Sequence, residues 1–172
     1  MTPAPETSID GSYEFVLRPG SYLIEAGIGF EHAHGYKYVP EWYDNAYDTN
    51  NATLVRVTLH NVTAGIDIYL AKSGSMSGHV YEEDGVTPIA GASVYAFPST
   101  GDHPGAGANT GQDGSYTIAG LPSGLYQVQA TVSDHVTQYY DNTPDEASAS
   151  EVTVNAPDDT SGVDFALSPA SE

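Results

Sequence analysis

The sequence predicts an all-β fold made of two copies of one β-sandwich, and three observations indicate this. Short runs rich in β-branched and aromatic residues alternate with period two between clusters of Gly, Pro, Asn and Asp. No stretch shows the spacing of an amphipathic helix. Residues 41–70 reappear as residues 138–167 at a constant offset of 97 residues (138 minus 41), with no gap. A period of about 100 residues is typical of sandwich-sized domains rather than of a solenoid.

The match extends upstream but does not reach the opening strands. Residues 10–27 parallel residues 113–131, and a seven-residue insertion in the first copy then shifts the register. Residues 74–112 precede the second copy and have no counterpart before the first. We therefore predict two domains. Residues 1–70 form an incomplete sandwich without its opening strands, and residues 73–168 form a complete one.

Seven short strands are expected in the second copy, a number typical of a β-sandwich. They lie near residues 76–82, 92–97, 115–119, 124–132, 137–140, 149–155 and 162–167. In the fourth, Tyr126, Val128 and Ala130 share one face and two glutamines share the other, as in a half-buried antiparallel strand. Residues 98–112, rich in Gly, Pro and Ala, are expected to be a loop or an irregular edge.

Turn residues separate the strands in both copies. Asp10-Gly11 and Asp113-Gly114 suit a tight turn that needs a positive φ. Pro19-Gly20 and Pro122-Ser123-Gly124 suit a corner between adjacent strands. The inward-facing positions expected in the first copy are Tyr22, Ile24, Ala26, Val55, Val57, Leu59, Ile66, Ile68 and Leu70.

Four motifs of the second copy resemble the carboxypeptidase regulatory-like domains. They are residues 78–92, 113–126, 140–142 and 162–167, and the first copy matches only from Asp10 onward. The resemblance implies a transthyretin-like, Greek-key sandwich related to the Cna B-type repeats of bacterial surface adhesins. It also implies extracellular modules that serve as stalks, spacers, adhesin segments or accessory domains, and it implies no catalytic residues.

The charge balance excludes several classes of partner. The chain has 23 acidic and four basic residues, a formal net charge of −19, and no Lys or Arg after Lys72. Such a surface repels nucleic acid and anionic lipid, because binding phosphates requires basic side chains. The sequence has no Cys, no apolar run of 18 residues and no basic-then-apolar start. We expect an acidic extracellular or cell-surface protein that does not insert into a membrane.

Each copy carries a loop with clustered oxygen atoms. The loops contain Tyr43, Asp44, Asn45 and Asp48, and Tyr140, Asp141, Asn142, Asp145 and Glu146. Calcium takes six to eight such oxygens, so one reading is a calcium site, although the spacing is not that of an EF-hand. The alternative is that Asp and Asn bond their own backbone while the Tyr packs inward. Glu82, Glu83 and Asp84 are a second acidic candidate or a charged hairpin tip. No cofactor is expected to be required.

The insertion and its flank are rich in aromatic side chains. The candidates for a ligand site or an interface are Tyr36, Tyr38, Trp42, Tyr43 and Tyr47, with Phe30 nearby. These rings could stack on sugars, form an interface, or cover the sheet end left bare by the missing strands. His32 and His34 share a face if the segment is extended, and they could chelate a transition metal or lie in an exposed loop.

Two further patterns bear on function. Asn51-Ala52-Thr53 and Asn61-Val62-Thr63 are N-glycosylation acceptor sequences, with Asn51 and Asn61 as the modified residues. No Gly-x-Ser-x-Gly elbow, phosphate loop or matched acid and base pair is present, so we expect no enzymatic activity.

A sandwich without its opening strands exposes backbone groups that are a template for a strand from another chain. The gap has two explanations: the sequence was cut from a longer array, or donated strands complete the first copy. We predict a non-enzymatic structural or adhesive module of an extracellular stalk or filament. Its partners would be copies of itself or neighbouring repeats, joined by strand exchange. The alternative is a carbohydrate-binding accessory module that uses Trp42 and the nearby tyrosines.

Overall fold

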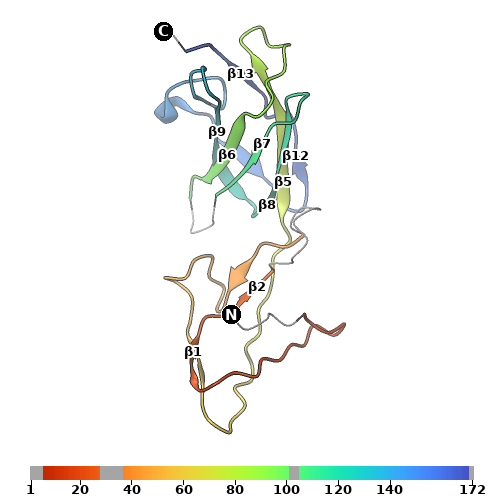
Figure 1. The fold of residues 1–172 in the computed structure, drawn as a ribbon, viewed down its shortest axis with the longest axis vertical. Coiled ribbons are helices and arrows are strands. Elements are labelled where there is room, and N and C mark those ends of the chain that lie inside the picture. Colours follow the sequence, from red (N-terminus) through yellow and green to blue (C-terminus); the bar gives the residue numbers. More distant parts are fainter. Residues whose placement is uncertain (1–5, 28–36, 101–104, 171–172) are drawn as a thin grey trace.

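The computed structural model describes residues 6–27, 37–100 and 105–170, and these residues form an all-β fold. The 3-10 helix η2 (Glu146–Ser148) lies among strands. The predicted fold class is thus confirmed. Within the described ranges, no helix has the length and apolar character needed to cross a bilayer. Figure 1 shows an elongated molecule, with the strands that follow residue 73 at one end and residues 6–27 and 37–72 at the other.

The C-terminal part contains two sheets whose strands come from both halves of the second copy. The first sheet consists of β5 (Gly74–Glu82), β8 (Ser115–Leu121), β12 (Asp159–Thr160) and β13 (Phe165–Leu167). The second consists of β6 (Ser93–Pro98), β7 (Ala106–Asn109), β9 (Gly124–Thr131), β10 (Gln138–Tyr139) and β11 (Val152–Val154).

Strand β5 is the central strand of the first sheet. It pairs antiparallel with β8 along one edge, where Gly78 lies opposite Tyr116. It pairs parallel with β12 and β13 along the other edge, where Val80 lies opposite Phe165. Its residues alternate between buried and partly exposed, as the period of a strand requires. Without β5, neither β8 nor β13 has a partner in its sheet.

The hydrophobic core lies between the two sheets. Its largest fully buried side chains are Tyr126, Phe165, Met76, Ile118, Leu121 and Leu167. All residues of the core cluster fall between positions 76 and 167. This end of the molecule has the buried interior that the sequence predicts for the second copy.

The prediction of a loop or an irregular edge over residues 98–112 is partly wrong, because Ala106–Asn109 forms β7, a regular strand at the edge of the second sheet. Residues 106–109 include none of the β-branched or aromatic residues that are typical of a strand. Antiparallel pairing with β6 holds these residues in the extended conformation instead. A Cβ on Gly107 would lie 2.6 Å from Cδ1 of Tyr95, so the small residue is what lets β7 pair there.

The described residues of the N-terminal part form two short antiparallel pairs. They are β1 (Gly20–Tyr22) with β4 (Val55–Val57), and β2 (Glu25–Ala26) with β3 (Glu41–Trp42). The first pair has the register of β9 with β11, since Tyr22 faces Val55 as Tyr126 faces Val152. The two copies thus place equivalent residues in equivalent pairs. The tandem arrangement and the boundaries 1–70 and 73–168 stay predictions.

Candidate functional site

The candidate site lies in the N-terminal part. It consists of two segments that correspond to β8 and β13, the strands that pair with β5 in the second copy. Residues 13–17 correspond to part of β8, and residues 66–70 correspond to the segment that contains β13. Neither segment forms a strand. Among the described residues, no main-chain hydrogen bond joins either segment to a neighbour. The reason is that no described residue occupies the place of β5 between them. We call the space between residues 13–17 and 66–70 the acceptor groove.

A tyrosine bridges the two sides of the acceptor groove. The hydroxyl of Tyr13 donates to the carbonyl of Ile66 over 2.6 Å. In the second copy the hydroxyl of Tyr116 donates to the carbonyl of Val163, also over 2.6 Å. Burial raises the pKa of the Tyr13 hydroxyl, and the nearby Asp67 carboxylate raises it further. The bridge therefore joins the two sides at the same pair of positions as in the second copy, with the phenol protonated.

The turn before residue 13 is also shared by both copies. Gly11 has a φ of +82° and Gly114 one of +76°, as the sequence predicts for these positions. The Asp10 carboxylate accepts from the hydroxyl of Ser12 at 2.7 Å and from its backbone N–H at 3.0 Å, and these bonds lower the pKa of Asp10. Asp113 and Ser115 make the same contacts. The chain enters both segments from the same local structure.

The acceptor groove is apolar and open. It belongs to a cavity of about 550 Å³ lined by residues that include Tyr13, Phe15, Leu17, Ile24, Val55 and Ile66. Phe15 and Ile68 are only half-buried, whereas their counterparts Ile118 and Phe165 are each 1% exposed. The inward face of the first copy thus has the composition of a core but not its coverage.

The Asp and Asn loops have the same local structure in both copies. The Tyr43–Asp44 and Tyr140–Asp141 peptides are cis, and Asn45 and Asn142 each have a φ of 53°. Asn142 Oδ1 also accepts from the backbone N–H of Ala166 in β13, at 2.9 Å. Within the described ranges, no hydrogen bond joins Asn45 to the corresponding Tyr69. The loop is anchored to the first sheet only where that sheet is complete.

The oxygens of these loops bond the protein itself. Asp48 Oδ1 accepts from the backbone N–H groups of Asn50 and Asn51 at 2.6 and 3.1 Å, and these bonds lower the pKa of Asp48. Asp145 caps η2 through the N–H of Ala147 at 3.1 Å. Asp44 and Asp141 each accept from the side chain of the asparagine that follows. In the part of the chain that the structure describes, no three acidic or His side chains group into a metal site. The arrangement is that of turn caps, and calcium binding stays a prediction.

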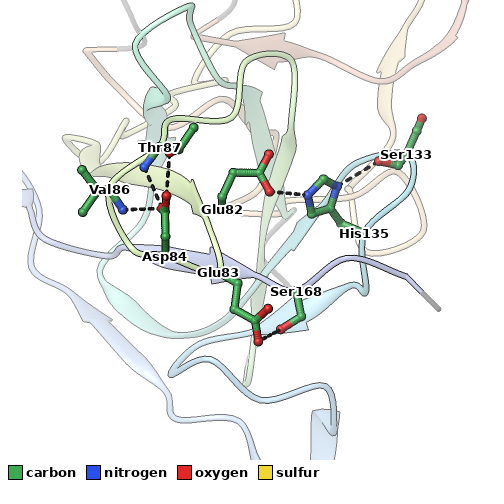
Figure 2. A network of polar contacts seen from close by, with 8 residues as sticks. All are labelled: Glu82, Glu83, Asp84, Val86, Thr87, Ser133, His135 and Ser168. Atoms are coloured by element: carbon green, nitrogen blue, oxygen red, sulfur yellow. Dashed lines mark hydrogen bonds and ion pairs between the residues drawn. The ribbon is translucent and has the colours of Figure 1, made fainter.

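The second acidic candidate consists of Glu82, Glu83 and Asp84, and each carboxylate contacts a different partner (Figure 2). Glu82 Oε2 lies 2.8 Å from His135 Nε2, and this contact raises the pKa of His135. Asp84 caps its own turn through Val86 and Thr87. Glu83 accepts from Ser168 at 3.3 Å. The three carboxylates contact different partners, and two of them tie the hairpin tip to later segments.

The aromatic candidates do not all occupy one environment. Tyr36 lies outside the described residues, as do Phe30, His32 and His34. Tyr38 is 37% exposed and forms a bridge with Lys72, and Trp42 and Tyr43 are half-buried. The Tyr47 hydroxyl donates to Oε1 of the buried Glu41 at 3.0 Å.

The two glycosylation candidates are exposed. The side-chain amide of Asn51 donates to Asp48 Oδ2 at 2.7 Å. That of Asn61 donates to the hydroxyl of Thr58 at 3.1 Å. Modification at either residue stays a prediction.

Sequence reasoning predicted that strands are missing but not how the remaining segments are held. The signal was present, because a Tyr follows each Asp-Gly-Ser, at Tyr13 and Tyr116. Its acceptor lies far along the chain and follows a glycine in each copy, at Ile66 and Val163. Only the structure shows that these positions meet.

Comparisons with known proteins identify one family. The model of the carboxypeptidase regulatory-like domain matches residues 75–168. No curated protein matches the chain. Similar solved structures include two mutants of a type II cohesin–X-dockerin complex from Acetivibrio cellulolyticus, both with a TM-score of 0.34. The C-terminal interface mutant is 16% identical, and the match covers 54% of this chain and 52% of that one. The N-terminal interface mutant is 18% identical, with 54% and 56% covered. The chain spans about half the length of these structures.

Proposed function

We propose that this chain, which belongs to the carboxypeptidase regulatory-like domain family, is a non-enzymatic structural or adhesive module of an extracellular stalk or filament. Its first copy accepts a β-strand, and strand exchange links it to a further repeat or a further chain. The acceptor groove is the single observation that carries this proposal, because two segments with core-like faces lie on either side of an unfilled strand position.

The energetics favour an incoming strand. The backbone N–H and C=O groups of residues 13–17 and 66–70 lack a main-chain partner among the described residues. An added strand would pair with both at once, which is the hydrogen-bond gain that drives β-augmentation. It would also cover apolar side chains that are now half-exposed, and this burial contributes about 25 cal/mol per Å².

The charge of the chain supports an extracellular setting. A net charge of −19 keeps molecules apart in dilute buffer, and salt screens this repulsion over about 8 Å at physiological strength. Strand exchange between copies should therefore strengthen as salt rises. The family consists of non-catalytic domains, which supports a structural role.

Analytical ultracentrifugation of the full chain over a wide concentration range tests the proposal. We expect species larger than the monomer that grow with concentration and with salt. Phe15→Asp places a charge on the inward face of the groove and should abolish them. Val86→Asp is the control, because Val86 is 75% exposed and is not among the residues that line the cavity. A chain that stays monomeric under all conditions, or that assembles equally well with Phe15→Asp, would contradict the proposal.

A further inference from the structure

We infer that the acceptor groove takes one strand in one register, with a glycine opposite Tyr13, a cationic or His residue directly after it, and apolar residues two positions before and after the glycine. The strand runs antiparallel to residues 13–17 and parallel to residues 66–70. This inference rests on the proposed function and names the partner. The donor is an opening strand of the β5 type from another repeat of this family.

The glycine follows from the tyrosine bridge. In the second copy Gly78 lies opposite Tyr116, whose hydroxyl holds the carbonyl of Val163 against β5. A Cβ on Gly78 would collide with that carbonyl oxygen and would lie 2.6 Å from the carbonyl carbon. The Tyr13 bridge to Ile66 reproduces this barrier in the acceptor groove. Only a residue without a Cβ passes it, so the bridge sets the register of the donor.

The residue after the glycine is set by charge. In the second copy Asp164 Oδ1 accepts from the backbone N–H of His79 at 2.8 Å and lies 3.6 Å from its ring Nδ1. Asp67 holds the corresponding place in the acceptor groove, and it is exposed. No hydrogen bond to its carboxylate is present among the described residues. Glu14 lines the cavity. In the second copy the hydrogen bonds from Ser115, and His79 in addition, lower the pKa of Asp113, the counterpart of Asp10. The groove is therefore complementary to a positive or protonatable side chain.

The apolar positions follow from the period of a strand. Met76 and Val80 lie two residues before and after Gly78, and both are 0% exposed. Met76 lies opposite Ile118, and Val80 lies opposite Phe165. Phe15 and Ile68 occupy the corresponding positions in the first copy. A donor with apolar residues at these two places would cover the half-buried side chains that line the groove.

The source of the donor follows from the pairing of β5 itself. The β5 strand of this chain is paired along both edges and contributes Met76 and Val80 to its own core. Donating it would remove the central strand of a complete sheet. Exchange of β5 between copies of this chain carries that cost and therefore needs a high concentration, whereas a strand of the same pattern from another repeat fills the groove without it. The geometry therefore favours a donor of the β5 type other than residues 74–82 of the same chain.

A peptide test separates this inference from the proposed function. The probe is a fluorescent peptide with the sequence of residues 73–84, titrated into the full chain and followed by anisotropy. We expect saturable binding, at least about tenfold weaker binding for the peptide with Gly78→Val, and several-fold weaker binding with His79→Glu. Binding should be lost in the Phe15→Asp chain and kept in the Val86→Asp chain, because Val86 does not line the cavity. This pair of variants locates the peptide in the groove rather than in the second copy.

Each outcome decides one claim. Equal binding of the Gly78→Val peptide would overturn the register while leaving strand acceptance intact. Absence of peptide binding in a chain whose oligomers are sensitive to Phe15→Asp would overturn the β5-type donor but not the proposed function. Absence of both peptide binding and oligomers would contradict the two together.

Discussion

The two copies show one set of residues with and without a central strand. Tyr116 is 4% exposed and Ile118 is 1% exposed, whereas Tyr13 and Phe15 are half-buried. The tyrosine bridges have the same length, 2.6 Å, in both copies. The Asp-Gly-Ser turn and the Asp-Asn loop are also shared. Local contacts thus form without the central strand, and what that strand adds is pairing and burial.

The comparison also shows what makes a strand in this fold. Residues 115–121 form β8, while residues 12–18, which begin with the same Ser-Tyr pair, do not form a strand. Residues 165–167 form β13, and residues 68–70 do not. β-Propensity is similar in the two copies, so the presence of a hydrogen-bonding partner decides the outcome. The acceptor segments, residues 13–17 and 66–70, have strand-like sequences but no main-chain hydrogen-bonding partner among the described residues.

The largest expected effect concerns the close approach at Gly78. Gly78→Ala places a Cβ against the backbone of Val163, so we expect a loss of about 3 kcal/mol in the free energy of unfolding of the second copy. Urea unfolding measures it. Gly124→Ala is the control, since its Cβ would meet only a ring carbon of Tyr126 at 3.6 Å, and it should be near neutral. Equal losses of stability for Gly78→Ala and Gly124→Ala would contradict the claim that the Val163 carbonyl, held by Tyr116, excludes a Cβ at position 78.

The two tyrosine bridges should differ in their contribution to stability. Tyr116→Phe leaves a buried carbonyl without its donor, so we expect a loss of about 1 to 2 kcal/mol. Tyr13→Phe should cost less than about 0.5 kcal/mol, because the partly exposed Ile66 carbonyl can bond water. Addition of the residue 73–84 peptide should increase the cost at Tyr13. Equal losses of stability for Tyr116→Phe and Tyr13→Phe in the free chain would contradict the open groove, because they would show that the Ile66 carbonyl is already shielded from water.

A smaller loss of stability is expected from a substitution in the Asp and Asn loops, and the same measurement tests the predicted calcium site. Asp145→Ala removes the cap of η2 and should cost about 1 kcal/mol in the presence of a chelator. The measurement is the melting temperature of the wild-type and variant chains in millimolar calcium and in chelator. A rise in calcium that is confined to the wild-type chain would establish the predicted calcium site. An unchanged melting temperature would leave the loops as turn caps.

The smallest expected effect is the pH dependence of the His135–Glu82 pair. Glu82 raises the pKa of His135 above its usual 6.5, so the pair stabilises the fold fully below pH 6.5 and loses this effect as pH rises through the folded pKa. Glu82 is 38% exposed, so the loss should be less than about 1 kcal/mol. Unfolding free energies at pH 6 and pH 8 should differ less in Glu82→Gln than in the wild-type chain. A Glu82→Gln chain with an unchanged pH profile would exclude the pair as the cause.

The sequence predicted those features that depend on local pattern or on the repeat. The offset of 97 residues predicted the missing opening strands, and Asp-Gly predicted the positive φ of Gly11 and Gly114. Strand β7 was missed because four small residues carry no pattern of their own. The partnership of Glu82 with His135 was missed because 53 residues separate them and no spacing rule joins them.

The candidate site was predicted in outline only. Alternation placed Ile66 and Ile68 on an inward face, but it did not show that a bridge from Tyr13 joins their segment to residues 13–17. The acidic loops suggested calcium from composition, whereas Asp48 and Asp145 bond their own backbone. Contacts between distant segments depend on three-dimensional register, which the sequence pattern does not encode directly.

Amide hydrogen exchange tests the central claim most directly, because it reads the backbone of the acceptor groove one residue at a time. Residues 13–17 and 66–70 should exchange rapidly in the free chain, while β8 and β13 are protected. Addition of the residue 73–84 peptide should protect both acceptor segments together and leave the second copy unchanged. Acceptor amides that stay rapid with the peptide bound, or that are already protected in the monomer, would contradict the account.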